Sequence, residues 1–213
     1  MKSTTSSPFD DFVERLRARA PAFPIPDQRA NFKGITFDQP GCYFPLRDCV
    51  VERSAIVGHA FIMSWSGVMM RRVDFSHTRG EAHWTACDFE KVKFRRLHAS
   101  LSVAECSFTA CDFYGSGWDD PVFVHSTFRN LSLKGLVLKG ALFYACRFED
   151  VDLGESRWYE SKTLEIRGSW KGKLGAESDE VAQRLFSTPG GGEFAPGTLR
   201  FEAEHGRLPS SQG

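Results

Sequence analysis

Apolar residues recur at every fifth position from Phe32 to Trp158, with an occasional step of four. This spacing marks 27 positions, of which all but Gly80 are apolar and 16 are Phe or Trp. A chain with 41% hydrophobic residues would place only about 11 apolar residues there by chance. Neither an α-helix nor a single β-strand repeats every five residues, but a solenoid of short stacked repeats can. The marked positions, called stops below, are Phe32, Phe37, Cys42, Leu46, Val51, Ile56, Phe61, Trp65, Met70, Phe75, Gly80, Trp84, Phe89, Phe94, Ala99, Val103, Phe108, Phe113, Trp118, Phe123, Phe128, Leu133, Leu138, Phe143, Phe148, Leu153 and Trp158.

The four-residue steps fall at one recurring point of this pattern. They occur at every fourth step, from Cys42 to Leu46, Phe61 to Trp65, Gly80 to Trp84 and Ala99 to Val103. Four steps therefore make one coil, of 19 residues early in the chain and 20 later. We number the faces of a coil one to four, beginning with the stop Phe32. The predicted fold is an all-β solenoid, a quadrilateral (four-sided) β-helix, over residues 30–160.

A second inward position lies two residues before each stop. Its occupants are mostly small or apolar, and no charged residue between 30 and 158 occupies either position. Burying an unpaired charge is costly, so this exclusion predicts that both positions face a dry core. All six cysteines follow the pattern, and we expect them to pack as small apolar side chains. The alternatives are metal binding or disulfides, since Cys87 and Cys106 would stack at a spacing of about 4.8 Å that permits a bridge.

A short motif accompanies the period: a small residue, then Asp or Asn, then Phe or Leu. It occurs at Ala30-Asn31-Phe32, Val73-Asp74-Phe75, Cys87-Asp88-Phe89, Cys111-Asp112-Phe113 and Val151-Asp152-Leu153. In this motif and its spacing the chain resembles the pentapeptide-repeat family. The resemblance implies a right-handed quadrilateral β-helix, from whose usual 20-residue coil the early 19-residue coils depart. It also implies a binding role, because the best-characterised members resemble duplex DNA and protect DNA gyrase or related topoisomerases from inhibitors.

Outside the repeat, the chain divides into three further parts. Residues 1–29 form a predicted N-terminal helix and cap segment, 161–190 a C-terminal cap with a short helix, and 191–213 a flexible tail. The first helix begins at Ser7-Pro8 and extends to about Ala20. A second helix is expected over residues 178–186, with Ser178 as its cap. Each helix could cover the solenoid or bind a partner; the first carries an apolar stripe of Phe9, Phe12, Val13 and Leu16.

Composition and charge limit the remaining classes. The 213 residues have no net charge and no apolar run of membrane-spanning length, and the N-terminus lacks the apolar core of a signal peptide. We therefore expect a cytoplasmic protein with no membrane contact. Between 30 and 158 there are 15 acidic and 15 basic residues, so a full-length DNA mimic is not supported, and direct nucleic-acid binding is not expected.

Outward positions on the first face carry two kinds of charge pattern. The residue after each first-face stop alternates in sign over much of the rod, which predicts a structural ladder of ion pairs. One position further on, Arg53, Arg72 and Lys91 stack with the same sign, and Arg96 lies near them. Like charges at strand spacing repel, so this basic surface could bind an acidic partner. Because acidic residues are interleaved with it, a solvated mixed surface is the alternative.

A second candidate surface is apolar. Val122, Val124, Leu142 and Tyr144 are placed outward on the fourth face of two successive coils. Contiguous exposed apolar side chains usually mark a contact surface. They could be covered by a terminal helix of this chain, or they could form a homodimer or partner interface.

The sequence contains no phosphate loop, metal motif or arrangement of nucleophile and base, so we expect no enzymatic activity and no cofactor. Two functions remain. One is a protein-interaction rod or scaffold. The other is a target-protection or immunity protein that binds DNA gyrase or another topoisomerase and confers resistance to an antibiotic or toxin. The balanced charge favours the first.

Overall fold

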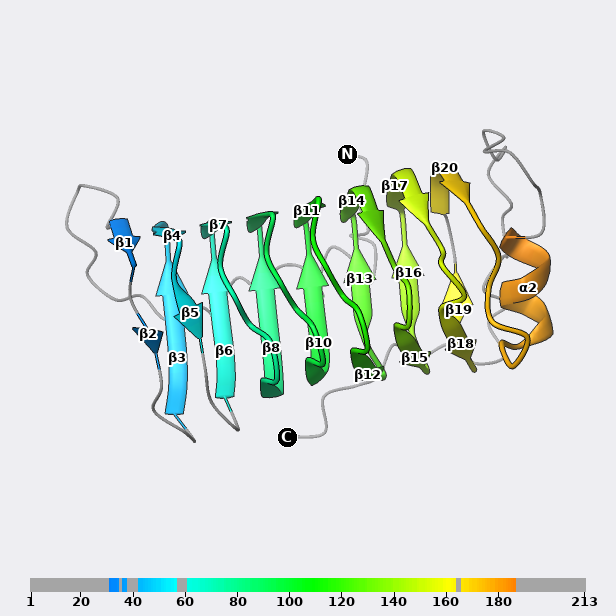
Figure 1. The fold of residues 1–213 in the computed structure, drawn as a ribbon, viewed down its shortest axis with the longest axis horizontal. Helices are drawn as coiled ribbons and strands as arrows, with labels where there is room; N and C mark the ends of the chain where they lie inside the picture. The colour runs from blue at the N-terminus through cyan, green and yellow to red at the C-terminus, as the bar shows by residue number, and fades with distance from the viewer. Residues whose placement is uncertain (1–30, 35, 38–41, 57–60, 164–165, 187–213) are drawn as a thin grey trace, which may run out of the picture.

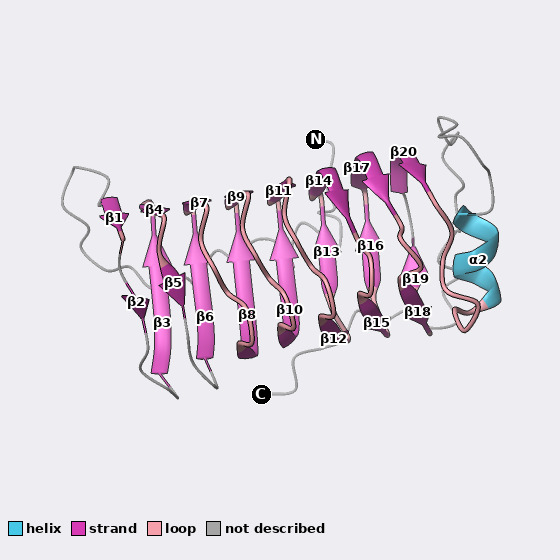
Figure 2. Cartoon of the chain, viewed as in Figure 1, coloured by secondary structure: helices cyan, strands magenta, loops and turns pink. Residues whose placement is uncertain are grey.

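The chain forms a rod of parallel strands stacked along one axis, with a short helix at its C-terminal end (Figures 1 and 2). A computed structural model describes residues 31–34, 36–37, 42–56, 61–163 and 166–186. The predicted N-terminal helix and the 191–213 tail lie outside these described residues. Strands pair in parallel with strands one coil away, and those inside each sheet pair on both sides. The predicted solenoid is therefore confirmed.

One sheet of eight parallel strands forms the first face along the whole rod. Its register places Phe32 beside Val51 and Phe89 beside Phe108, a shift of 19 residues. From Phe108 onward the shift is 20, since Phe108 pairs with Phe128 and Phe128 with Phe148. The strands are β1 (Asn31–Lys33), β4 (Val50–Glu52), β7 (Met69–Arg71), β9 (Asp88–Glu90), β11 (Ser107–Thr109), β14 (Thr127–Ser132), β17 (Cys146–Asp152) and β20 (Ile166–Lys171).

The third and fourth faces form a second sheet of ten strands, which branches. In the early coils one long strand crosses both faces: β3 (Cys42–Arg47), β6 (Phe61–Ser66), β8 (Arg79–Thr85) and β10 (His98–Ala104). In the later coils the third face has β12 (Gly117–Asp119), β15 (Val137–Lys139) and β18 (Arg157–Tyr159). The fourth face has β13 (Val122–Val124), β16 (Leu142–Tyr144) and β19 (Lys162–Thr163). Strand β10 pairs with both β12 and β13.

The second face is narrow. It carries the two-stranded sheet of β2 (Thr36–Phe37) and β5 (Ala55–Ile56). Single bridges then continue from coil to coil, joining Ala55 to Asp74, Asp74 to Lys93, Lys93 to Asp112 and Asp112 to Ser132. Here the Asp of the repeat motif stabilises the turn that follows it. The Asp74 carboxylate accepts a hydrogen bond from the Ser76 amide at 2.9 Å, and Asp112 accepts one from Tyr114 at 3.1 Å. The motif thus encodes a local turn as well as the core.

The four-residue step removes a corner. Most corners contain a residue with left-handed backbone, two positions after a stop, such as Asp120 at φ 47°. After the third-face stops Gly80 and Ala99 no such residue occurs, and the backbone stays extended through Ala82 and Leu101. A strand alternates its side chains with a period of two, so stops four residues apart can both point inward without a turn. Coils from Gly117 onward have separate strands on the third and fourth faces, whereas in earlier coils one strand crosses both. The four-sided cross-section stays a prediction.

The interior is filled by the stops. From Val51 to Trp158 every described stop except Gly80 is buried, and the only buried polar residues of the described chain are Ser and Thr. Aromatic rings stack from coil to coil along the rod. Phe108 lies between Phe89 and Phe128, with ring centroids 4.9 and 5.0 Å away, and Phe123 stacks on Phe143 at 4.8 Å. These stacks extend the hydrophobic core through successive coils.

Gly80 interrupts the apolar stops for a steric reason. It has φ 144°, and a Cβ added there would lie 1.9 Å from the carbonyl oxygen of Phe61 in the previous coil. No real Cβ can approach an oxygen so closely. The one stop that is not apolar is therefore a point where two backbones come too close for any side chain.

The solenoid continues past the predicted boundary at residue 160, because β19 pairs with β16 and β20 pairs with β17. Helix α2 (Glu180–Phe186) then covers the open end of the core. Phe186 is buried, with ring centroids 4.9 Å from Trp158 and 5.3 Å from Trp170. The cap residue is Asp179, which accepts a hydrogen bond from the Ala182 amide at 2.7 Å. The prediction of Ser178 as the cap was wrong, since its hydroxyl accepts from the Trp158 amide instead.

The cysteines whose side chains are described are all buried and free of disulfides. Several thiols donate to backbone carbonyls, as Cys111 does to Phe89 at 3.3 Å and Cys146 to Phe123 at 3.5 Å. Serines at equivalent inward positions do the same, as Ser126 does to Val124. Burial raises the pKa of Cys49 to about 11 and the pKa values of Cys111 and Cys146 to about 12. The prediction that these thiols pack in the core is confirmed for the described five.

The stacked rings generate a first prediction. Phe108→Ala removes a fully buried ring from the middle of the aromatic stack and should lower the free energy of unfolding by about 3–5 kcal/mol. Thr109→Ala, one residue along on the outer surface, should change it by less than about 0.5 kcal/mol. Denaturant unfolding measures both. Equal losses would show that the assignment of inward and outward positions is wrong.

The close approach at Gly80 generates a second. Gly80→Ala should destabilise the fold far more than Gly115→Ala, whose added Cβ would lie 3.5 Å from the nearest atom, the Cγ of Arg96. The control substitution costs only the strain of a left-handed backbone, about 1 kcal/mol. Thermal unfolding of the two variants tests this. A Gly80→Ala protein as stable as the control would contradict the steric account.

The buried thiols generate a third. Their raised pKa values mean that unfolded thiols ionise first, so their contribution to stability is full below about pH 8.5 and is lost as the pH rises toward about 11–12. At pH 8 the thiols of Cys111 and Cys146 should therefore react with a thiol reagent only as fast as the chain unfolds. Mass spectrometry of labelled peptides measures each site, with the denatured chain as control. Rapid labelling of Cys146 in the folded protein would refute the prediction.

Candidate protein-interaction surface

A row of basic residues lies at the corner between the first and second faces. Arg53, Arg72 and Lys91 occupy the same position in three successive coils, two residues after the stops Val51, Met70 and Phe89. All three side chains are exposed. We call these three residues the basic corner.

The backbone of the basic corner is left-handed, with φ of 48° at Arg53, 55° at Arg72 and 54° at Lys91. This conformation costs an ordinary L-residue roughly 1–2 kcal/mol, and glycine adopts it freely. Equivalent corners elsewhere on the first face carry Gly34 and Ala110, so the fold does not require a charged residue here. The choice of Arg and Lys is therefore not explained by folding.

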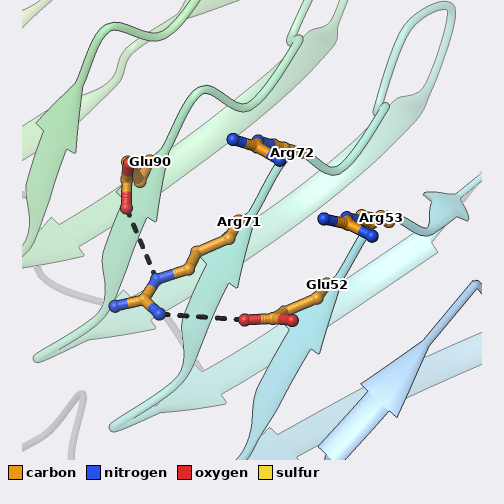
Figure 3. A pocket seen from close by; sticks show the side chains of 5 residues that line it. All are labelled: Glu52, Arg53, Arg71, Arg72 and Glu90. Atoms are coloured by element: carbon orange, nitrogen blue, oxygen red, sulfur yellow. Dashed lines mark ion pairs between the residues drawn. The ribbon is translucent and has the colours of Figure 1, made fainter.

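An ion ladder borders the basic corner, as the sequence predicted. Arg71 lies between two carboxylates, with nitrogen-to-oxygen distances of 3.7 Å to Glu52 and 3.4 Å to Glu90 (Figure 3). Further along the same face, Arg129 pairs with Glu149, which lowers the pKa of that carboxyl through the hydrogen bond. These pairs are exposed and contribute little to stability. They do neutralise the charges next to the corner.

The guanidinium groups of Arg53 and Arg72 stand apart from this ladder. Neither makes an ion pair with another described residue, whereas Lys91 pairs with Glu90 at 3.6 Å. Together with Glu52, Arg71 and Glu90 they line an open surface hollow of about 260 Å³. Figure 3 shows the guanidinium groups of Arg53 and Arg72 beside the Glu52–Arg71–Glu90 ladder. The hollow thus presents two positive charges that no other described residue neutralises by an ion pair.

Arg96 lies on the next corner, between the second and third faces, and not within the basic corner itself. It too is exposed, has a left-handed φ of 55°, and makes no ion pair with another described side chain. The structure adds a neighbour that the sequence reasoning missed. Tyr114 is 51% exposed, and its backbone carbonyl accepts a hydrogen bond from the Arg96 amide at 3.1 Å. Its position one residue after a stop was the signal that could have identified it.

Charge reverses along the rod. The corner column that contains Arg53 and Arg72 carries Asp150 in a later coil, and the Arg96 column carries Glu155. Both carboxylate residues are exposed. The two columns flank the narrow second face, and their corner residues change from basic at Arg53, Arg72 and Arg96 to acidic at Asp150 and Glu155.

The predicted apolar surface is not exposed. Val122, Val124 and Leu142 have exposed fractions of 7%, 0% and 8%, and only Tyr144 is half-buried, with its ring against His125 at 5.6 Å. Side chains that alternation places outward are therefore covered, which was one of the two alternatives for this surface. Whether they contact a partner stays a prediction.

The described residues contain no cluster of three or more His, Cys, Asp or Glu that could hold a metal ion. No helix among them is long and apolar enough to cross a membrane. The aromatic core leaves the outer side chains as the groups available for binding.

Comparisons with known proteins give only distant matches. No family model and no curated protein matches the chain. It is similar to the structure of QnrB1, a plasmid-mediated fluoroquinolone resistance protein, at 14% identity over 64% of this chain and 71% of that one, with a TM-score of 0.25. It is also similar to HetL, a pentapeptide repeat protein involved in heterocyst differentiation regulation from the cyanobacterium Nostoc, at 9% identity over 72% and 88% with a TM-score of 0.19. At these values neither neighbour informs the partner or activity of this chain.

The repeat in the chain itself is stronger evidence for its fold than these distant matches. The five-residue spacing, the small–Asp–Phe motifs and the parallel coils agree along the described residues. In fold, the chain is a solenoid of parallel β-strand coils built on five-residue steps.

Proposed function

We propose that the chain is a non-enzymatic interaction rod that binds an acidic protein surface through the basic corner. The supporting observation is the pair Arg53 and Arg72, stacked in successive coils without ion pairs to other described residues. At a spacing of about 4.8 Å, two like charges in water repel by roughly 1 kcal/mol. An acidic partner would relieve this repulsion and accept hydrogen bonds from both guanidinium groups.

The rod suits this role mechanically. Backbone hydrogen bonds link each coil to the next, so the spacing of the charged side chains is set before a partner arrives. Preorganised charges lose little conformational entropy on binding and favour a partner with matching carboxylate spacing. A cytoplasmic location, predicted from the sequence, is part of the proposal.

The alternative function is protection of DNA gyrase or another topoisomerase. The acidic C-terminal corners, Asp150 and Glu155, favour contact with a nucleic-acid-binding surface, whereas the basic corner opposes it. A supercoiling assay of gyrase with a quinolone, with and without this protein, separates the two functions. Absence of both rescue and gyrase binding would exclude protection of that enzyme and leave the interaction rod.

The basic corner generates a binding prediction. The double variant Arg53→Gly, Arg72→Gly removes both charges at corners where glycine adopts the backbone freely, so the fold should be retained. Binding of a labelled Glu- and Asp-rich peptide should weaken by about 2- to 30-fold, because each exposed charge pair contributes about 0.2–1 kcal/mol. Fluorescence anisotropy measures this, and binding by the unaltered chain should weaken as salt rises.

The matched control is Ala86→Gly, Ala110→Gly, which changes two other left-handed corners without changing charge. It should bind the peptide as the unaltered chain does. Equal affinities for the charge-deleted variant and this control would refute the proposed surface. Tighter binding to duplex DNA of the same charge would indicate a nucleic-acid partner instead.

A further inference from the structure

The outer side of the fourth face is covered over five successive coils. Ser64, Thr85, Ala104, Val122, Val124 and Leu142 have exposed fractions of 3%, 1%, 0%, 7%, 0% and 8%. We call these six residues the covered stripe. They lie on β6, β8, β10, β13 and β16, which are neighbours in the same sheet.

These side chains point away from the core. Each lies next to an inward stop on its strand, as Val122 and Val124 flank Phe123, and neighbours along a strand face opposite sides. On the third-face half of the same long strands, the outward residues Glu81 and Ser100 are exposed. Ser100 is as small as Ser64, so small size alone does not account for the burial. Something covers the fourth face and leaves the third face open.

Among the described elements, none supplies this cover. The neighbours of β13 and β16 are other strands in the plane of their own sheet. Helix α2 packs through Phe186 on Phe148, Trp158 and Trp170 at the end of the rod. The cover must therefore come from a part of this chain beyond the described ranges.

We propose that residues 8–20 dock on the covered stripe as a helix. Their apolar residues Phe9, Phe12, Val13 and Leu16 share one face of a helix, which matches an apolar stripe that contains Val122, Val124 and Leu142. The opposite face of that helix carries Asp11, Glu14 and Ala18, which suit solvent. The segment thus has the amphipathic character that an outer cover needs.

The lengths agree. Five neighbouring strands at about 4.8 Å span about 19 Å, and a helix of 13 residues at 1.5 Å per residue is about 20 Å long. The connection to β1, residues 21–30, contains Pro21, Pro24 and Pro26. An extended proline-rich segment of this length reaches about 31 Å, enough to pass from the first coil to the neighbouring fourth face.

The test is photo-crosslinking in the full chain. p-Benzoylphenylalanine in place of Phe12 should crosslink to peptides of β10, β13 or β16, and the same group in place of Ala18, about 180° around the helix from Phe9, should not. Peptides are identified by mass spectrometry from a mixture of ¹⁵N-labelled and unlabelled chains. Crosslinks confined to one isotope support docking within one chain. Crosslinks that join both isotopes, or that map to other faces, overturn the proposal.

A second measurement keeps the proposal testable if crosslinking perturbs the segment. Leu16→Asp should uncover the stripe and raise the fluorescence of a hydrophobic dye several-fold, whereas Ala18→Asp introduces the same charge on the opposite face and should not. The circular dichroism of the strands should be retained in both. Equal dye responses, or a response to Phe201→Asp in the C-terminal segment but not to Leu16→Asp, would assign the cover elsewhere and refute the inference.

Discussion

Coil-on-coil pairing is the constraint on which the rest of the structure depends. Every described strand is hydrogen-bonded to equivalent strands one coil away, so each inward side chain must fit directly above its predecessor. Phe89, Phe108 and Phe128 meet this requirement as rings stacked about 5 Å apart. Where the backbone of one coil approaches the next too closely, only glycine remains, as at Gly80. The core therefore combines rings stacked between successive coils with contacts around each coil, such as Phe89 with Phe94 and Phe108 with Phe113.

Much of this arrangement could be predicted from spacing alone, because a period of five has few structural solutions. The burial of Phe108, the inward thiols of Cys111 and Cys146, and the Glu52–Arg71–Glu90 ladder all follow from position within the coil. The shortened step was also visible in the sequence. Its result, a merged face with strand β10 paired to two strands, depended on backbone φ values that residue types do not specify.

The candidate surface was less predictable, for a physical reason. Position in the coil says which way a side chain points but not what lies beyond it. Arg53 and Arg72 point outward and are exposed, whereas Val122 and Val124 point outward and are buried. The helix cap shows the same limit, since Ser178 and Asp179 are both good caps and only Asp179 lies where the Ala182 amide can reach it. Contacts between distant segments decide such cases.

The branch at β10 has a consequence for how the coils assemble. Identical repeats can pair with the wrong neighbour, because every coil offers the same hydrogen-bonding edge. In the early coils of this rod the seven-residue strand β8 pairs along its whole length with the seven-residue strand β10. In the later coils the three-residue strands β12 and β13, which a corner separates, pair with β15 and β16. At β10 the corner between β12 and β13 already lies against an unbroken strand, and a coil that skipped its proper place would create a further mismatch of this kind. The difference between the 19-residue and 20-residue coils thus favours the correct order of coils and opposes a shift in strand pairing by a whole coil.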